Sequence, residues 1–161
     1  MKKYALALAT VAPLALASTA NAKDMSGRFG LGGQLDSGGL AGLSLKYWIS
    51  DLGIQGIFGL SMVGESADGA GDDATALGLG LRVLYNIARA NDTNLYAGAG
   101  VSLGLIDADQ TQLDVILGVE HFFTDHFSVA GHIGLHVDLG DRFSLDLGNT
   151  AGWGTSFHFY F

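Results

Sequence analysis

From about residue 25 to the C-terminus, large apolar side chains alternate with small or polar ones along most of the chain. A period of two residues is typical of β-strands, because successive side chains point to opposite faces of a strand. Glycine recurs inside these runs at a frequency that would destabilise a helix. The pattern predicts an all-β fold with eight strands, at residues 25–35, 40–49, 54–63, 75–87, 94–105, 113–123, 127–139 and 151–161.

The two faces of these strands have an unusual content. In the run 75–87, one face carries Leu77, Leu79 and Leu81, and the other carries Gly78 and Gly80. A strand face that meets water usually carries long polar side chains such as Lys and Glu. Small residues are instead typical of the interior of a narrow closed barrel, whose large apolar side chains then face lipid. The alternation therefore predicts an eight-stranded antiparallel up-and-down transmembrane β-barrel rather than a soluble β-sandwich.

The first 22 residues have the pattern of a secretory signal peptide. Lys2 and Lys3 precede an apolar stretch from Tyr4 to Leu16, and Ala20-Asn21-Ala22 has the small-x-small form of a cleavage site. The stretch is short for a membrane anchor, and no later stretch reaches the roughly 18 apolar residues that a membrane helix needs. We therefore expect a cleaved signal peptide at 1–22 and a barrel domain at 23–161.

An even number of strands places both chain ends on one side, which is the periplasmic side in bacterial barrels. The connections on that side are expected at 50–53, 88–93 and 124–126, and those on the outer side at 36–39, 64–74, 106–112 and 140–150. Aromatic residues cluster near the strand ends on the periplasmic side, which predicts one interfacial girdle. Its members are Phe29, Tyr47, Trp48, Tyr85, Tyr96, Phe122, Phe123, Phe127, Phe159, Tyr160 and Phe161.

The mature chain resembles the small eight-stranded outer-membrane β-barrel family of Gram-negative bacteria, the OmpA/OmpX type of barrel. The resemblance rests on the Gly-rich alternating strands, on the segment GVEHFFTDHF at 118–127 and on the ending FHFYF at 157–161. In that family the barrel assembly machinery reads the last strand as an insertion signal, which implies this role for Phe157, Phe159 and Phe161. Its members include structural anchors, adhesion barrels, narrow pores and lipid-modifying enzymes, so the resemblance implies a fold and a membrane rather than one activity.

Composition and charge exclude several other classes of protein. The chain has no Cys, which rules out a disulfide scaffold and a thiolate metal site. Its formal net charge of -8, with only 8 Lys and Arg, argues against a nucleic-acid partner. With 48% hydrophobic residues, the chain is also too apolar for intrinsic disorder.

The period of two residues predicts which charged side chains point into the barrel. Buried charges must be paired, so we expect these residues to form a network of salt bridges and hydrogen bonds that plugs the lumen. An open alternative is a narrow ion or small-solute channel whose network opens under a stimulus. The predicted lumen network comprises Arg28, Lys46, Arg82, Asp114, Glu120, His132, His136, Asp138 and His158, with Gln34, Gln55 and Asn86 on the same face.

The estimated strand register places His132 near His158 and Asp114 near His136. Such a cluster is able to titrate between pH 5 and 8 or to hold a metal, but the ligand spacing is not diagnostic and we expect no cofactor or metal. A lipid-A-directed hydrolase is a further alternative. The barrel lipid-A deacylases of the family carry a His and a Ser two residues apart, whereas Ser156 and His158 have the reverse order and point inward. We therefore predict no catalytic residues.

The predicted outer loops are acidic, which either keeps them solvated or allows them to share divalent cations with lipopolysaccharide phosphates. Arg142 and Phe143 are the candidates there for contact with a protein. The acidic residues are Glu65, Asp68, Asp72, Asp73, Asp107, Asp109, Asp141 and Asp146.

The sequence as a whole predicts a monomeric, non-enzymatic, integral outer-membrane barrel with a structural or surface-interaction role. Its expected partners are outer-membrane lipid, lipopolysaccharide and the barrel assembly machinery.

Overall fold

A computed structural model describes residues 23–37, 41–63, 74–106, 111–139, 144–145 and 152–161. The predicted signal peptide and the acidic and contact candidates of the outer loops lie outside these residues. No helix in the described part of the chain is long and apolar enough to cross a membrane. The strands formed by the described residues are β1 (Phe29–Asp36), β2 (Gly42–Ile49), β3 (Leu52–Val63), β4 (Ala74–Ala90), β5 (Thr93–Ile106), β6 (Thr111–Phe122), β7 (Phe127–Asp138), β8 (Ser144–Leu145) and β9 (Gly152–Tyr160).

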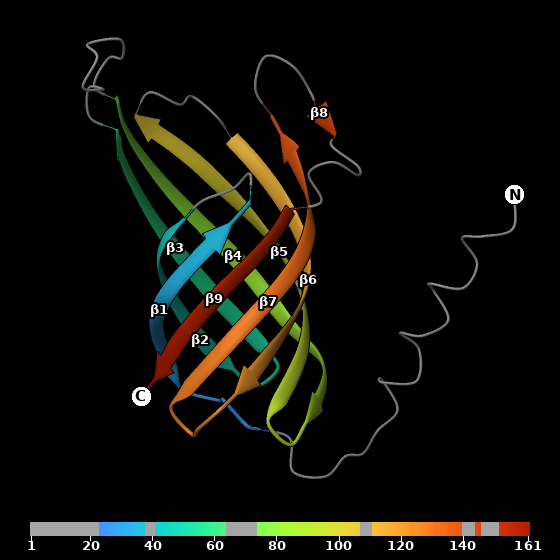
Figure 1. The fold of residues 1–161 in the computed structure, drawn as a ribbon. Helices are drawn as coiled ribbons and strands as arrows, with labels where there is room; N and C mark the ends of the chain where they lie inside the picture. Colours follow the sequence, from blue (N-terminus) through green and yellow to red (C-terminus); the bar gives the residue numbers. More distant parts are fainter. Residues whose placement is uncertain (1–22, 38–40, 64–73, 107–110, 140–143, 146–151) are drawn as a thin grey trace, which may run out of the picture.

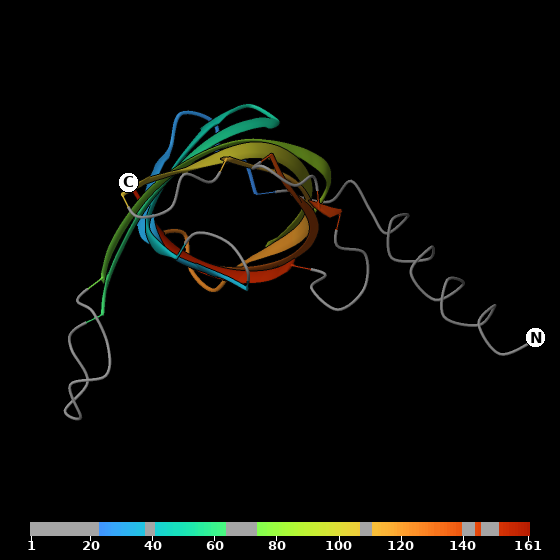
Figure 2. The same ribbon diagram turned by 90° about the horizontal axis from the view of Figure 1, so that it is seen from above.

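The strands close into a barrel (Figures 1 and 2). From β1 to β7, each strand pairs antiparallel with the next one, β7 pairs with β9, and β9 pairs with β1. The two-residue strand β8 also pairs with β7, beyond the end of β9. Eight long strands therefore form the wall, and the predicted all-β, eight-stranded antiparallel up-and-down barrel is confirmed.

Two of the three turns at the end of the barrel where β1 begins and β9 ends are tighter than predicted. β3 begins at Leu52 rather than at residue 54, so only Ser50 and Asp51 separate it from β2. β4 runs on to Ala90, beyond the predicted end at residue 87, because a bulge between Asn86 and Ala88 shifts the register and breaks the alternation in the sequence. Residues 25–28, which were predicted to belong to the first strand, precede β1, which begins at Phe29.

The orientation of the two strand faces is as predicted. Leu79, Leu81, Leu103 and Phe159 are between 41% and 53% exposed on the outside of the barrel. Their strand neighbours of opposite parity point inward, and even the charged side chain of Glu120 is completely buried there. The barrel is thus inverted relative to a soluble protein, with apolar side chains outside and polar ones along its axis.

Several inward glycines are the places where large lumen side chains fit. A Cβ atom on Gly30 would lie 2.7 Å from the ring of Tyr160, and one on Gly53 would lie 2.7 Å from the ring of Trp48. A Cβ atom on Gly100 would come within 2.5 Å of the Cγ of Arg82. The glycines at these positions therefore have a steric reason, because each leaves room in the narrow interior for the bulky side chain of a neighbouring residue.

The predicted aromatic girdle is only partly correct. Exposed rings do gather near the end of the barrel where β1 begins and β9 ends, at Phe29, Tyr47, Tyr85, Phe123, Phe159 and Phe161. The prediction was wrong for Trp48, Tyr96, Phe122 and Tyr160, which are at most 2% exposed and fill the lumen. The position of a residue along a strand sets its height along the barrel axis. Whether its number is odd or even within the strand sets whether its side chain faces the lumen or the outside. Neighbours such as Tyr47 and Trp48 therefore point to opposite sides.

Candidate functional site: the charged lumen

A first ionic group lies in the part of the lumen nearer the chain ends. Lys46 on β2 places its Nζ 3.2 Å from Oε2 of Glu120 on β6. The other carboxylate oxygen of Glu120 accepts hydrogen bonds from the hydroxyls of Ser128 and Tyr160, at 2.6 and 2.8 Å. The side chains of Lys46 and Glu120 are at most 1% exposed. Residues from four strands thus meet at one carboxylate, both oxygens of which have polar partners. A buried charge is tolerated when it is paired and hydrogen-bonded in this way.

A second ionic group is centred on Arg82 of β4. Its Nε donates to Oδ2 of Asp114 on β6 at 2.6 Å, and its Nη2 donates to Oδ2 of Asp36 on β1 at 2.7 Å. The same Asp36 lies 3.0 Å from Nε2 of His132 on β7 and accepts a hydrogen bond from Gln34. The guanidinium therefore joins two carboxylates from different sides of the barrel.

Neutral side chains connect this second group to the rest of the lumen. The amide nitrogen of Gln55 on β3 donates to Oε1 of Gln34 at 2.5 Å and to the hydroxyl of Ser44 on β2 at 2.8 Å. The Ser44 hydroxyl lies 2.9 Å from Nε2 of His158 on β9. A continuous chain of polar contacts therefore crosses the barrel interior.

The structure brings most of the predicted lumen residues together. Arg28 lies at the end of the barrel, where its Nη1 donates to the carbonyl of Asp125 at 2.7 Å, so it does not join either ionic group. His136 is partly buried, and Asp138 ends β7 with a side chain outside the described part. Those buried in the lumen are Lys46, Arg82, Asp114, Glu120, His132 and His158.

One of the two predicted proximities in the lumen was wrong. Asp114 is the register partner of His136, as expected. His132, however, lies opposite Gly154, which is four residues and therefore about 13 Å along β9 from His158. The prediction assumed a simple hairpin between the last two long strands, whereas the observed register of β9 on β7 is offset from it by four residues. Within the described residues, no group of three or more His, Cys, Asp or Glu side chains is arranged to hold a metal.

Asp36 is a charged site residue that sequence reasoning missed. It was expected to begin the first outer loop, because Asp is common in turns. It is instead the last residue of β1, and its side chain is 1% exposed and contacts both Arg82 and His132. The alternation of the sequence did indicate its orientation, since Asp36 lies two residues after the inward-facing Gln34 and therefore shares its face of the strand.

Ser156 and His158 do not form a reactive pair in this arrangement. Both point into the lumen and are at most 5% exposed. The His158 ring contacts the hydroxyl of Ser44 rather than that of Ser156. Because the side chains of both residues are shielded from solvent, the geometry offers a substrate no approach to them.

A closed eight-stranded antiparallel barrel with an apolar exterior and a charged interior has the fold of an OmpA-type outer-membrane β-barrel. Among solved structures, the chain is similar to the N-terminal β-barrel domain of Pseudomonas aeruginosa OprF, with a TM-score of 0.52 and 18% sequence identity. The match covers 82% of this chain and 96% of that domain. At this identity the likeness concerns the fold. No protein-family model and no curated protein matches the sequence.

Proposed function

We propose that this chain is an integral protein of a bacterial outer membrane with a structural or surface-interaction role and a closed lumen. The observation that carries the proposal is the combination of an apolar exterior with buried ion pairs along the axis. Leu81, Val115 and Trp153, on three different strands, are between 53% and 60% exposed. An apolar surface that runs over all the long strands is far larger than the patches that soluble monomers expose. We infer that lipid covers this apolar surface.

Three outward-facing phenylalanines on the last strand support the proposed route of insertion into the membrane. Phe157, Phe159 and Phe161 project outward and are 48%, 50% and 76% exposed. An apolar row of this kind is accessible from outside the barrel before the seam between β9 and β1 closes. The barrel assembly machinery is therefore the proposed partner for these three residues, and outer-membrane lipid is the proposed partner for the finished wall.

An arginine on the outer wall tests the membrane assignment. Leu81 lies in the middle of β4 and is 53% exposed. We expect Leu81→Arg to destabilise the folded barrel in phosphatidylcholine vesicles by about 2–4 kcal/mol, which is the cost of a cation at the bilayer midplane. The matched control is Asn91→Arg in the exposed turn between β4 and β5, where no loss is expected. Equal folded yields for the two variants would contradict a lipid-facing wall.

A narrow channel is the second candidate function, and one observation favours it. Nη1 of Arg82, Oδ1 of Asp114 and both ring nitrogens of His136 are buried without a hydrogen-bond partner among the described residues. Buried polar atoms of this kind are normally satisfied by water. This part of the lumen is therefore polar and able to hold water, which a conducting path requires.

Conductance separates a closed barrel from a channel. In a planar bilayer we expect the purified wild-type protein to give no stepwise current, because the proposed closed lumen holds two buried ionic groups and the polar contacts of Gln55. Fluorescence of labelled protein in the same bilayer verifies insertion. Reproducible stepwise currents from inserted wild-type protein would favour the channel.

A further inference from the structure

The six residues that precede β1 fold back into the barrel instead of extending the strand. We call Lys23 to Arg28 the N-terminal plug. The Asp24 carboxylate accepts hydrogen bonds from the backbone N–H of Ser26, at 2.9 Å, and from its hydroxyl, at 2.6 Å. The Arg28 N–H donates to the carbonyl of Met25 at 3.0 Å, and Gly27 has a φ of 77°. These features form a tight turn that begins at Met25 and has Ser26 and Gly27 at its tip.

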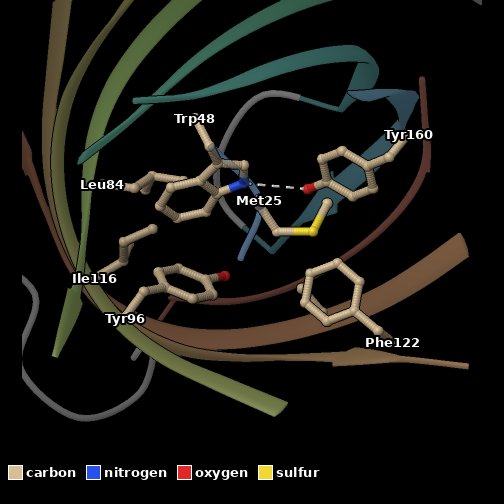
Figure 3. Close-up of a cluster of buried hydrophobic side chains, with 8 residues drawn as sticks. Met25, Trp48, Leu84, Tyr96, Ile116, Phe122 and Tyr160 are labelled. Carbon is tan, nitrogen blue, oxygen red and sulfur yellow. Dashed lines mark hydrogen bonds between the residues drawn. The ribbon is translucent and has the colours of Figure 1, made fainter. Parts of the chain in front are cut away.

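Met25 lies inside the lumen and is 1% exposed. It packs in a cluster of large buried side chains that come from both halves of the barrel (Figure 3). A thioether is suited to such a position, since it is flexible and makes favourable contacts with aromatic rings. The labelled side chains around Met25 are Trp48, Leu84, Tyr96, Ile116, Phe122 and Tyr160.

Charged and backbone contacts hold the plug at the rim. The Lys23 ammonium donates to Oδ1 of Asp125 at 2.7 Å and lies 5.6 Å from the centre of the Phe122 ring. The hydrogen bond from Lys23, together with its charge, lowers the pKa of the Asp125 carboxyl. On the other side, the N–H of Gly27 donates to the carbonyl of Trp48 at 2.8 Å. The plug is thus attached both to β2 and to the turn between β6 and β7.

We propose that the N-terminal plug closes the end of the lumen at which β1 begins and β9 ends, and that Met25 is its stopper. The barrel then has two closures in series, because Arg82 lies on β4 two residues farther from this end than Leu84 of the Met25 cluster, whereas Glu120 bonds to Tyr160 of that cluster. In the proposed orientation the plug seals the periplasmic end. Loss of the Arg82 ionic group alone therefore leaves the lumen closed, and release of the plug exposes its inner wall to solutes from that side.

Thiol accessibility measures this closure directly, since the natural chain has no Cys. Ala130 is 1% exposed, lies on the inner wall and belongs to the Met25 cluster, so Ala130→Cys is the probe. The purified full chain in detergent micelles is treated with a small charged methanethiosulfonate. We expect slow labelling of the probe in the otherwise natural sequence, and labelling at least about tenfold faster when the plug is undocked.

Two glycines provide a matched way to undock the plug. A Cβ atom would meet nothing within 4 Å at either Gly27 or Gly56, but only Gly27 has a positive φ, which an L side chain disfavours. We expect Gly27→Ala to raise the labelling rate of the probe about tenfold and Gly56→Ala to leave it unchanged. Equal rates in the two backgrounds would overturn the proposal.

A second pair of variants tests the stopper itself. Met25→Ala removes most of the side chain and is expected to give fast labelling, whereas Met25→Leu keeps the volume and is expected to label slowly. Far-UV circular dichroism verifies that each variant keeps its strands, and the exposed position Ser26→Cys verifies that the reagent is active. Slow labelling in Met25→Ala would likewise refute the plug, and because the assay uses micelles, this result is independent of the membrane assignment.

Discussion

Replacing Arg82 by Ala is expected to lower the free energy of unfolding by about 3–5 kcal/mol, because the loss of one partner leaves a buried charge unpaired. Arg82 donates to both Asp36 and Asp114, and all three side chains are at most 2% exposed. Without the guanidinium, two carboxylates share a closed space, and only His132 and Gln34 remain beside Asp36. Urea titration of the refolded protein in micelles, followed by tryptophan fluorescence, measures the change.

Glu120→Ala is expected to have an effect of the same size for the same reason. The Lys46 side chain is only 1% exposed, and the substitution removes its counterion. It also removes the acceptor of the hydrogen bonds from the Ser128 and Tyr160 hydroxyls. The double variant Lys46→Met/Glu120→Leu removes both charges and is expected to recover most of the lost stability, because a well-packed apolar pair often replaces a buried ion pair without loss.

The control for both variants is a carboxylate at the rim. Asp125 also pairs with a lysine, Lys23, but its side chain is 79% exposed and solvent screens the interaction. Asp125→Ala is therefore expected to leave barrel stability nearly unchanged. Similar small effects for Arg82→Ala, Glu120→Ala and Asp125→Ala would show that the lumen charges are solvated rather than paired.

The sequence alone predicted the barrel and the facing of most side chains, because parity along a strand decides the face. Leu81 and Arg82 are neighbours, and one points to the outside and the other to the lumen. This inference needs no knowledge of which strands are adjacent. It failed beyond Asn86, where the bulge adds a residue to the period and β4 continues to Ala90, and at Asp36, where a residue typical of turns continues a strand.

The pairing of the lumen charges was beyond the sequence pattern for a different reason. Arg82 contacts Asp36 across a closed barrel, and that contact depends on the register of every strand pair between β4 and β1. A long connection fixes register poorly, so the pairing of β7 with β9 was estimated incorrectly and His132 received the wrong partner. The turn at Met25 did carry a local signal, since Asp24 and Gly27 are common turn residues, but the alternation around them favoured a strand.

Gly32→Ala is expected to have the most severe effect of any single methyl group added to the wall. Gly32 pairs with His158 at the seam between β1 and β9. A Cβ atom there would overlap the carbonyl oxygen of Phe157 and lie 2.9 Å from the Cα of His158. Because these are backbone atoms, no rotamer change relieves the overlap, and the two strands must separate.

Separation of β1 from β9 opens the barrel, since this pairing joins the first long strand to the last. We therefore expect Gly32→Ala to cost at least about 3 kcal/mol, the upper end for an overpacked site, and to leave most molecules unclosed after refolding. Gly56→Ala is the matched control, because its Cβ meets nothing within 4 Å and its effect should stay within about 1 kcal/mol. Folded yield by circular dichroism and unheated gel mobility gives the comparison. Equal yields would mean that the seam is more widely spaced than in this structure, and that contacts elsewhere close the barrel.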